Sequence, residues 1–273
     1  MLFDEQHDDS SISPIDQFFE NTLRLNKLWA TQGPGFILEP ELGILLLLGY
    51  VSAVESYMRA LIRRIVHVDA HAQTCCENQM LSFAAALHHK DAMLPEALLE
   101  ESVFSGKKGI LTAINKFVGL DLNQDREVTD LLDQYNNVCE LRHCCVHRFG
   151  KLGTKNAVSL GLQGHKQFLE KPLKLGVADI TKIADLLLTL VRVINNVMFK
   201  RVLTRTATSS TRGQVSVGPN WTWKKGRDKP KYLRYYMIFA SEKDAQPSPN
   251  ADEMYERFRA VFGSATGNGA TTV

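Results

Sequence analysis

The 273-residue chain is 44% hydrophobic and carries a formal net charge of +2 at neutral pH. This length and composition are typical of a globular protein with one main domain and smaller additions. The low charge excludes nucleic-acid binding through the overall electrostatic field, so any such binding requires a local basic patch.

The cysteines and the apolar segments predict a soluble, cytoplasmic protein. The five cysteines form two adjacent pairs and one leftover thiol, a poor disulfide framework that fits a reducing compartment. Residues 1–11 are polar and acidic and lack the pattern of a secretory leader. The longest apolar run stops at Glu55, short of the ~20 residues that span a bilayer. We therefore expect no membrane association.

Helical patterns follow one another along most of the chain. Apolar residues recur at three- and four-residue steps, and breaks such as TQGPG separate the helices. Residues 1–12 are expected to be disordered, and residues 150–176 to form a loop or a small hairpin. The predicted helices cover roughly residues 13–29, 40–68, 77–89, 94–103, 107–118, 125–149 and 177–203, of which 40–68 is expected to be central.

The composition changes after Thr204. TRTATSSTRGQ is typical of a linker, and residues 221–240 resemble two β-rich runs around a turn. A short helix is expected within 241–262 and disorder at 263–273. The protein is thus predicted to be mainly α, a helical bundle with a small β-containing, basic and aromatic C-terminal tail. The predicted domains are 1–40, an N-terminal arm with one helix; 41–205, the helical domain; and 206–273, the linker, hairpin and flexible C-terminus.

The sequence ELRHCCVHRFG, residues 140–150, contains the strongest candidates for catalytic residues. It places Arg142, His143 and His147 on the last turns of an amphipathic helix that Gly150 is expected to end. Arg142 follows the apolar stripe of this helix, where a charge is costly unless it is paired or faces a wet cleft. The arginine therefore marks either a structural ion pair or a catalytic site.

A second charge lies on the apolar face of the predicted central helix, at Glu55. One interpretation pairs Glu55 with Arg59 or Arg63 on its own helix. The other pairs it with Arg142 across a helix–helix contact, because a carboxylate and a guanidinium on packed faces each need a partner.

The sequence R-H-C-C-V-H, from Arg142 to His147, resembles the signature of the HEPN superfamily. That signature is an arginine, a polar residue, a short spacer and a histidine on a late core helix. Many members also carry a glutamate like Glu55 in their first core helix. The resemblance covers about residues 41–203, implies a HEPN-like helical bundle, and leaves residues 204–273 without a counterpart.

The resemblance implies a metal-independent endoribonuclease without a cofactor, whose composite cleft lies between two copies of the chain. His147 would transfer protons at the ribose 2′-OH or the leaving oxygen, and Arg142 would bind the scissile phosphate. His143 would orient the pair or bind phosphate, and Glu55 would orient Arg142. A toxin or antiviral-defence setting, with a regulatory or antitoxin protein as partner, follows by analogy. The alternative is a catalytically inactive HEPN-like scaffold that binds RNA or a protein.

The two histidines, four residues apart and close to Cys139 and Cys144, also suggest a zinc site. No Cys-x-x-Cys or His-Glu-x-x-His sequence supports it. Core packing explains the thiols more simply, so we predict no bound metal.

Residues 221–236 combine cations with aromatic side chains. This pattern fits RNA, because cations contact phosphates and aromatic faces stack on unpaired bases. The alternative is a small hairpin whose aromatic residues pack on the helical bundle while its lysines protect the edges. The predicted RNA-binding residues are Lys224, Lys225, Arg227, Lys229, Lys231 and Arg234, interleaved with Trp221, Trp223, Tyr232, Tyr235 and Tyr236.

Overall fold

The structure is a computed structural model that describes residues 2–4, 6, 11–33, 35–88, 93–208, 210–212, 215–217 and 221–263. The described chain is mainly helical, as predicted. It divides into two compact units: a larger unit, Gln17–Ile194, and a smaller unit, Met1–Asp16 together with Asn195–Val273. The expected disorder at 1–12 lies partly outside the described residues, and that at 263–273 almost wholly.

The boundaries between the units fall inside two helices, α1 (Pro14–Asn26) and α10 (Val177–Ala207). They therefore differ from the predicted domain limits near residues 40 and 205. Each helix contributes residues to both cores, since Phe18 and Ile194 are buried in one unit and Asp16 and Met198 in the other.

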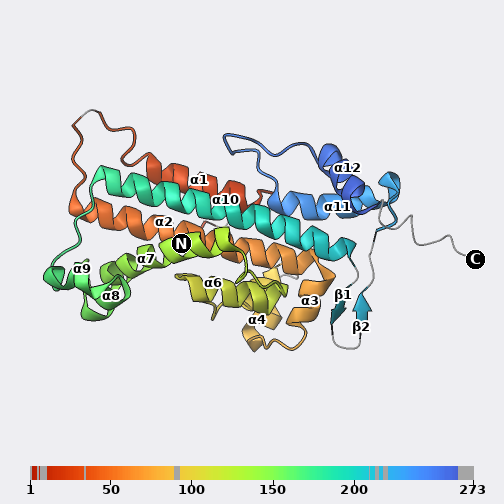
Figure 1. The fold of residues 1–273 in the computed structure, drawn as a ribbon, viewed down its shortest axis with the longest axis horizontal. Coiled ribbons are helices and arrows are strands. Elements are labelled where there is room, and N and C mark those ends of the chain that lie inside the picture. Colours follow the sequence, from red (N-terminus) through yellow and green to blue (C-terminus); the bar gives the residue numbers. More distant parts are fainter. Residues whose placement is uncertain are drawn as a thin grey trace, which may run out of the picture. The chain divides into compact units, whose positions relative to one another are not determined.

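The larger unit is built around α2 (Pro40–Val68), the long helix expected at its centre (Figure 1). Pro40 occupies the first helical position, where its missing N–H removes no hydrogen bond. α1 packs on α2 through an edge-on contact between Phe18 and Tyr57, with ring centroids 6.3 Å apart. Burial on most sides explains the nearly continuous apolar character of α2. Its most deeply buried side chains are Leu46, Leu47, Tyr50, Val51, Val54, Tyr57, Met58, Leu61, Ile62 and Ile65.

By length and composition alone, α2 is also apolar enough to cross a membrane. Of its most apolar window, 56% is buried inside the fold. The central helix of a bundle has both properties, so they are weak evidence for a membrane span.

Short helices follow α2. They are α3 (Ala70–Cys76), α4 (Phe83–His88), α5 (Leu94–Ala97), α6 (Lys107–Ala113) and the π-helix η2 (Ile114–Val118). The helices predicted over 77–89 and 94–103 are thus shorter than expected, at α4 and α5. The one predicted over 107–118 is α6 continued by η2.

α7 (Arg126–Arg148) agrees with the helix predicted over 125–149 and packs against α2. The next segment contains α8 (Thr154–Ser159), α9 (Leu162–His165) and the 3-10 helix η3 (Lys166–Phe168). The loop or hairpin predicted over 150–176 is therefore wrong where these three short helices form and correct for the residues around them. Gly153 and Gly161 precede two of the helices. The ends of the segment pair through an antiparallel bridge between Lys151 and Pro172.

The smaller unit contains the end of α10, an antiparallel ladder and two helices. These are β1 (Ser210–Arg212), β2 (Val215–Val217), α11 (Lys225–Phe239) and α12 (Ala251–Phe262). Asp16 links the N-terminal part of this unit to the segment that follows α11. Its buried carboxylate accepts hydrogen bonds from the Ser241 hydroxyl and from the backbone N–H groups of Glu242 and Lys243.

The β-rich hairpin predicted over 221–240 is wrong, because most of these residues form α11. The buried positions of α11 recur at steps of four, three and four residues, the spacing of one helix face. They are Asp228, Tyr232, Tyr235 and Phe239, and Ile238, three residues after Tyr235, is buried as well. Packing of this face outweighs the β propensity of the tyrosines that suggested strands. The ladder of β1 and β2 precedes the predicted hairpin and does not replace it.

Candidate functional site on helix α7

α7 is capped at both ends and stays helical through the signature residues. At its start, the Asp125 carboxylate accepts a hydrogen bond from the Val128 N–H at 3.4 Å. At its end, Phe149 adopts a left-handed conformation with φ 50°, and the Gly150 N–H donates to the Cys144 carbonyl oxygen at 3.0 Å. Left-handed backbone at both Phe149 and Gly150 thus ends the helix after Arg148, and the signature residues stay helical.

Arg142 and His147 consequently lie on different faces of α7. Five residues at 100° each separate them by about 140° around the helix axis. His143 and His147 share a face, with ring centroids 6.2 Å apart and an interplanar angle of 50°. One copy of α7 therefore presents its two histidines together but directs its arginine elsewhere.

Arg142 lies on the same face of α7 as the buried residues Tyr135 and Cys139. Burial raises the pKa of the Cys139 thiol to about 12, against the effect of its hydrogen bond with Tyr135. The Glu55 carboxylate of α2 adds to this rise in pKa, and the Arg142 guanidinium opposes it. Both charges are thus close to one buried thiol, which they approach from two different helices.

The ion pair between Glu55 and Arg142, one of the two interpretations of Glu55, is not formed. In the described part of the chain, no carboxylate oxygen lies within 4.0 Å of the Arg142 guanidinium. The other partners considered for Glu55 are engaged elsewhere, since Arg59 and Arg63 each lie 3.6 Å from Glu96. Glu55 and Arg142 are only half-buried, so water can solvate each charge without an ion pair.

The histidine face includes a carboxylate that the sequence analysis did not single out. Glu140 Oε2 lies 4.0 Å from His143 Nδ1, too far for a hydrogen bond but close enough to attract a protonated ring. Asn156 of α8 holds this carboxylate by donating from Nδ2 to Glu140 Oε2 at 2.7 Å. The sequence could have indicated this contact, because residues three apart on a helix, such as Glu140 and His143, lie next to each other. Asn156 was not predictable, because its segment was expected to be a loop or hairpin.

His147 is exposed and has exposed apolar neighbours in the sequence. Val146 is 48% exposed and Phe149 is 77% exposed. Beside them, the Arg148 guanidinium pairs with both carboxylate oxygens of Glu170, at 2.7 and 2.6 Å. Arg148 is therefore occupied, whereas Val146 and Phe149 offer apolar surface that a second chain can cover.

The thiols of the motif are buried and protonated. Burial raises the pKa of Cys145 to about 11 and also raises that of Cys144, so both pack as small apolar groups at neutral pH. The five cysteines are all free thiols. Among the residues that the structure describes, no three His, Cys, Asp or Glu side chains gather closely enough to hold a metal ion.

Comparisons of the chain with protein family models, with curated proteins and with solved structures find no match. The side chains of α7 themselves define the available chemistry. An arginine binds phosphate through charge-assisted hydrogen bonds, and a histidine gives and takes protons near neutral pH. Because Arg142 and His147 point in different directions, one copy of the helix does not aim both at a single phosphate.

The predicted RNA-binding cations lie on or beside α11, and two of them are held in ion pairs with α12. Lys225 Nζ lies 3.6 Å from a carboxylate oxygen of Glu256. Lys229 Nζ lies 2.7 Å from a carboxylate oxygen of Asp252. Their charges are therefore already compensated within the smaller unit. Lys224, Lys225, Arg227 and Arg234 are exposed, and three of them, Lys224, Arg227 and Arg234, have no carboxylate oxygen within 4.0 Å in the described part of the chain.

Three of the five aromatic residues around these cations belong to the core of the smaller unit, whereas Trp223 and Tyr236 are half-buried. Trp221 is 6% exposed and packs edge-on against Phe258 of α12, with ring centroids 5.1 Å apart. The Lys231 ammonium lies 4.7 Å from the Trp221 ring centroid. Tyr232 and Tyr235 are also buried. These rings are not available to stack on bases, which favours the packed interpretation, with α12 as the packing partner in place of a hairpin.

Proposed function

We propose that the larger unit is a HEPN-type domain that cleaves RNA without a metal ion. The observation that carries the proposal is the state of Arg142. It is half-buried on a packed helix, yet no carboxylate among the described residues lies within 4.0 Å of it. Such a guanidinium can donate two parallel hydrogen bonds to the oxygens of one phosphate. His143 and His147 on the same helix supply groups for proton transfer.

In the proposed reaction, the ribose 2′-oxygen attacks the neighbouring phosphorus. His147 of one copy takes the 2′-OH proton, and His147 of the other copy gives a proton to the departing 5′-oxygen. The bond from phosphorus to the 5′-oxygen breaks as the bond to the 2′-oxygen forms. The products are a 2′,3′-cyclic phosphate and a 5′-hydroxyl, and no water is consumed.

The other residues bind and orient. Arg142 contacts the non-bridging phosphate oxygens and offsets the charge that develops in the transition state. His143, with Glu140 beside it, binds phosphate or orients His147. Glu55 acts on Arg142 only through space, since the two form no ion pair.

The decisive experiment is RNA cleavage by the full chain in EDTA. We expect cleavage to continue and to leave 2′,3′-cyclic phosphate ends, because the nucleophile belongs to the substrate. DNA of the same sequence, which lacks the 2′-OH, should stay intact. Cleavage that stops in EDTA and returns with zinc or magnesium would refute the mechanism. RNA binding without cleavage would instead favour the inactive scaffold.

The proposed cleft needs two copies of the chain, because Arg142 and His147 diverge within one copy. Val146 and Phe149 supply apolar surface next to His147 for this contact. We expect Phe149→Asp to weaken dimerisation in light scattering and to lower activity in parallel. The control is Val261→Asp, at a valine of α12 that is 68% exposed. An active wild-type monomer at the assay concentration would contradict the composite cleft.

A further inference from the structure

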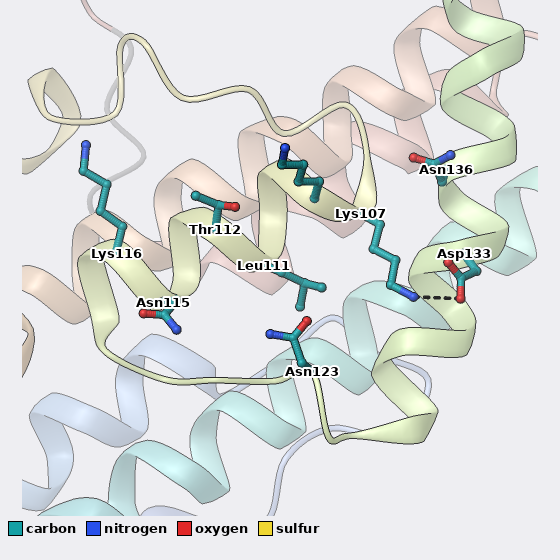
Figure 2. A pocket seen from close by; sticks show the side chains of 9 residues that line it. Lys107, Leu111, Thr112, Asn115, Lys116, Asn123, Asp133 and Asn136 are labelled. Carbon is teal, nitrogen blue, oxygen red and sulfur yellow. Dashed lines mark hydrogen bonds and ion pairs between the residues drawn. The ribbon is translucent and has the colours of Figure 1, made fainter. Parts of the chain in front are cut away.

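A cleft of about 740 Å³ lies beside α7 in the larger unit. Figure 2 shows its walls: α6 and η2 on one side, α7 on the other, and the segment that carries Asn123 between them. The volume falls within the range of about 300–1,000 Å³ that is usual for ligand sites. Its described lining includes none of the residues proposed above for catalysis.

The cleft carries an excess of positive charge. Its charged lining residues are Lys107, Lys108, Lys116 and Asp133. Lys107 neutralises Asp133, with 2.7 Å between Nζ and the carboxylate oxygen (Figure 2). Within the described ranges, neither Lys108 nor Lys116 has a carboxylate oxygen closer than 4.0 Å. The Lys116 ammonium lies 4.8 Å from the Phe117 ring centroid, a contact that does not neutralise its charge, so both charges are available to an anion.

The spacing of Lys108 and Lys116 favours an anion with several phosphates. The two lysines are eight residues apart on α6 and η2, which corresponds to about 12 Å along the helix axis. This distance separates their backbones, and lysine side chains that extend from points so far apart need not meet at one phosphate. Successive phosphates of a nucleic-acid strand can each meet one lysine.

Side-chain amides line the rest of the cleft. The carboxamides of Asn115 and Asn136 have no hydrogen-bond partner in the part of the chain that the structure describes. Asn123 donates to Asp121 Oδ1 at 2.6 Å, and Figure 2 shows its carboxamide pointing toward Leu111. A carboxamide offers a donor and an acceptor side by side, which matches the edge of an unpaired base. Base edges are free in a single strand and occupied in a duplex.

The face of α7 that carries Asn136 continues toward the histidines. Asn136 shares one face of α7 with His143 and His147, which follow it by seven and eleven residues. Eleven residues correspond to about 17 Å of helix. A stacked strand covers this length with roughly five nucleotides, at ~3.4 Å each.

We propose that this cleft binds single-stranded RNA, with successive phosphates on Lys108 and Lys116 and a base edge on Asn115 and Asn136. The proposed binding in the cleft depends only on the residues that line it. That the strand then continues along α7 to His147 rests on the proposed nuclease function.

An RNA that cannot be cleaved tests the binding separately from catalysis. A labelled single strand of about six nucleotides, with 2′-O-methyl groups throughout, lacks the nucleophile but keeps its phosphates. Its affinity for the full chain is measured by fluorescence anisotropy at several salt concentrations. For Lys108→Ala/Lys116→Ala we expect binding at least about tenfold weaker. The slope of log K against log salt should fall by about 1.4, or about 0.7 for each lost phosphate contact.

The matched control is Lys174→Ala/Lys182→Ala, which removes two exposed lysines elsewhere in the larger unit. Its affinity and salt slope should equal those of the wild type. Asn115→Ala/Asn136→Ala should keep the salt slope of the wild type. Because it lacks the amides that contact a base edge, it should bind oligonucleotides of uridine, adenosine and cytidine with more nearly equal affinities than the wild type does.

Several results would overturn the proposal. Wild-type affinity and salt slope in Lys108→Ala/Lys116→Ala would exclude the cleft as the binding site. Equal binding of a nucleoside monophosphate would exclude the need for a strand, and equal binding of a duplex would exclude base recognition. If the protein binds as expected but leaves ordinary RNA intact, the binding proposal for the cleft holds and the nuclease proposal is refuted. If Lys108→Ala/Lys116→Ala cleaves RNA and binds it as the wild type does, the nuclease proposal holds and the binding proposal for the cleft is refuted.

Discussion

Helices α7 and α11 carry the two groups of residues that suggested a function, but their charges have different partners. On α7, Arg142 has no carboxylate within 4.0 Å among the described residues. On α11, Lys225 and Lys229 are paired with acidic residues of α12, and the neighbouring aromatic rings are buried. A cluster of cations is a binding surface only where the fold leaves it uncompensated. Lys224, Arg227 and Arg234 stay exposed and uncompensated on or beside α11, but three of the rings that would stack on bases beside them, Trp221, Tyr232 and Tyr235, are buried. We therefore propose α7 as the functional helix.

The largest expected effect tests α7 directly. Arg142→Ala and His147→Ala should each lower the rate of RNA cleavage about a hundredfold or more, the usual scale for losing a charge stabiliser or an acid–base group. The control is His165→Ala, at a histidine of α9 whose Nδ1 lies 2.9 Å from the Gly161 carbonyl oxygen. Initial rates in EDTA decide the matter. If both variants on α7 cleave like the wild type, the site is elsewhere and the preference for α7 fails.

The next effect tests whether α11 is a structural helix. Asp228 is buried and accepts hydrogen bonds from the Thr222 N–H and hydroxyl at 3.2 and 2.9 Å. The buried Tyr255 hydroxyl donates to the same carboxylate at 3.4 Å. Asp228→Ala leaves this buried donor without an acceptor and should lower the free energy of unfolding by about 1–2 kcal/mol, since water can reach the exposed Thr222. Asp228→Asn keeps an acceptor oxygen and should lose less. Chemical denaturation measures both, and equal stability of the alanine variant and the wild type would contradict the structural role.

Alkaline pH tests the buried face of α7. The pKa of Cys139 is about 12 in the folded protein, above the ordinary 9.0. The folded state therefore holds this proton more tightly, so the stability is complete below pH 9.0 and falls as the pH rises toward 12. At about pH 10.5 the expected loss is about 2 kcal/mol. Cys139→Ala should reduce the slope of the unfolding free energy against pH above pH 9.0, and Cys145, whose pKa is about 11, should account for part of the slope that remains. An unchanged slope would mean that the thiol is solvated.

The smallest effect is expected from the ion pairs of α11. Lys225 and Lys229 are 45% and 41% exposed at their side chains, and surface pairs contribute less than about 1 kcal/mol each. Lys225→Ala/Lys229→Ala should therefore barely change the melting temperature. It should also weaken RNA binding less than Lys108→Ala/Lys116→Ala does. A larger loss of affinity in the α11 variant would make α11 the main RNA surface and reverse the comparison.

Helices that carry local signals at their ends could be predicted from the sequence alone. The bounds of α7 follow from an Asp125 cap, an apolar stripe and Gly150, all within the segment itself. The angle between Arg142 and His147 is likewise a property of one regular helix. The long helix α2 follows from its proline start and its apolar run for the same reason.

Features that depend on contacts between distant residues emerged only in the folded chain. α11 is a helix because its tyrosines have a helical partner in α12, a contact that local β propensity does not contain. Glu55 and Arg142 share the surroundings of Cys139 without pairing, because half-burial leaves both charges solvated. Asn156 reaches Glu140, and Lys108, Asn123 and Asn136 line one cleft, only once the chain has folded. The period of a sequence indicates which face of a helix is buried, but the partner of each polar group is set by the elements packed around it.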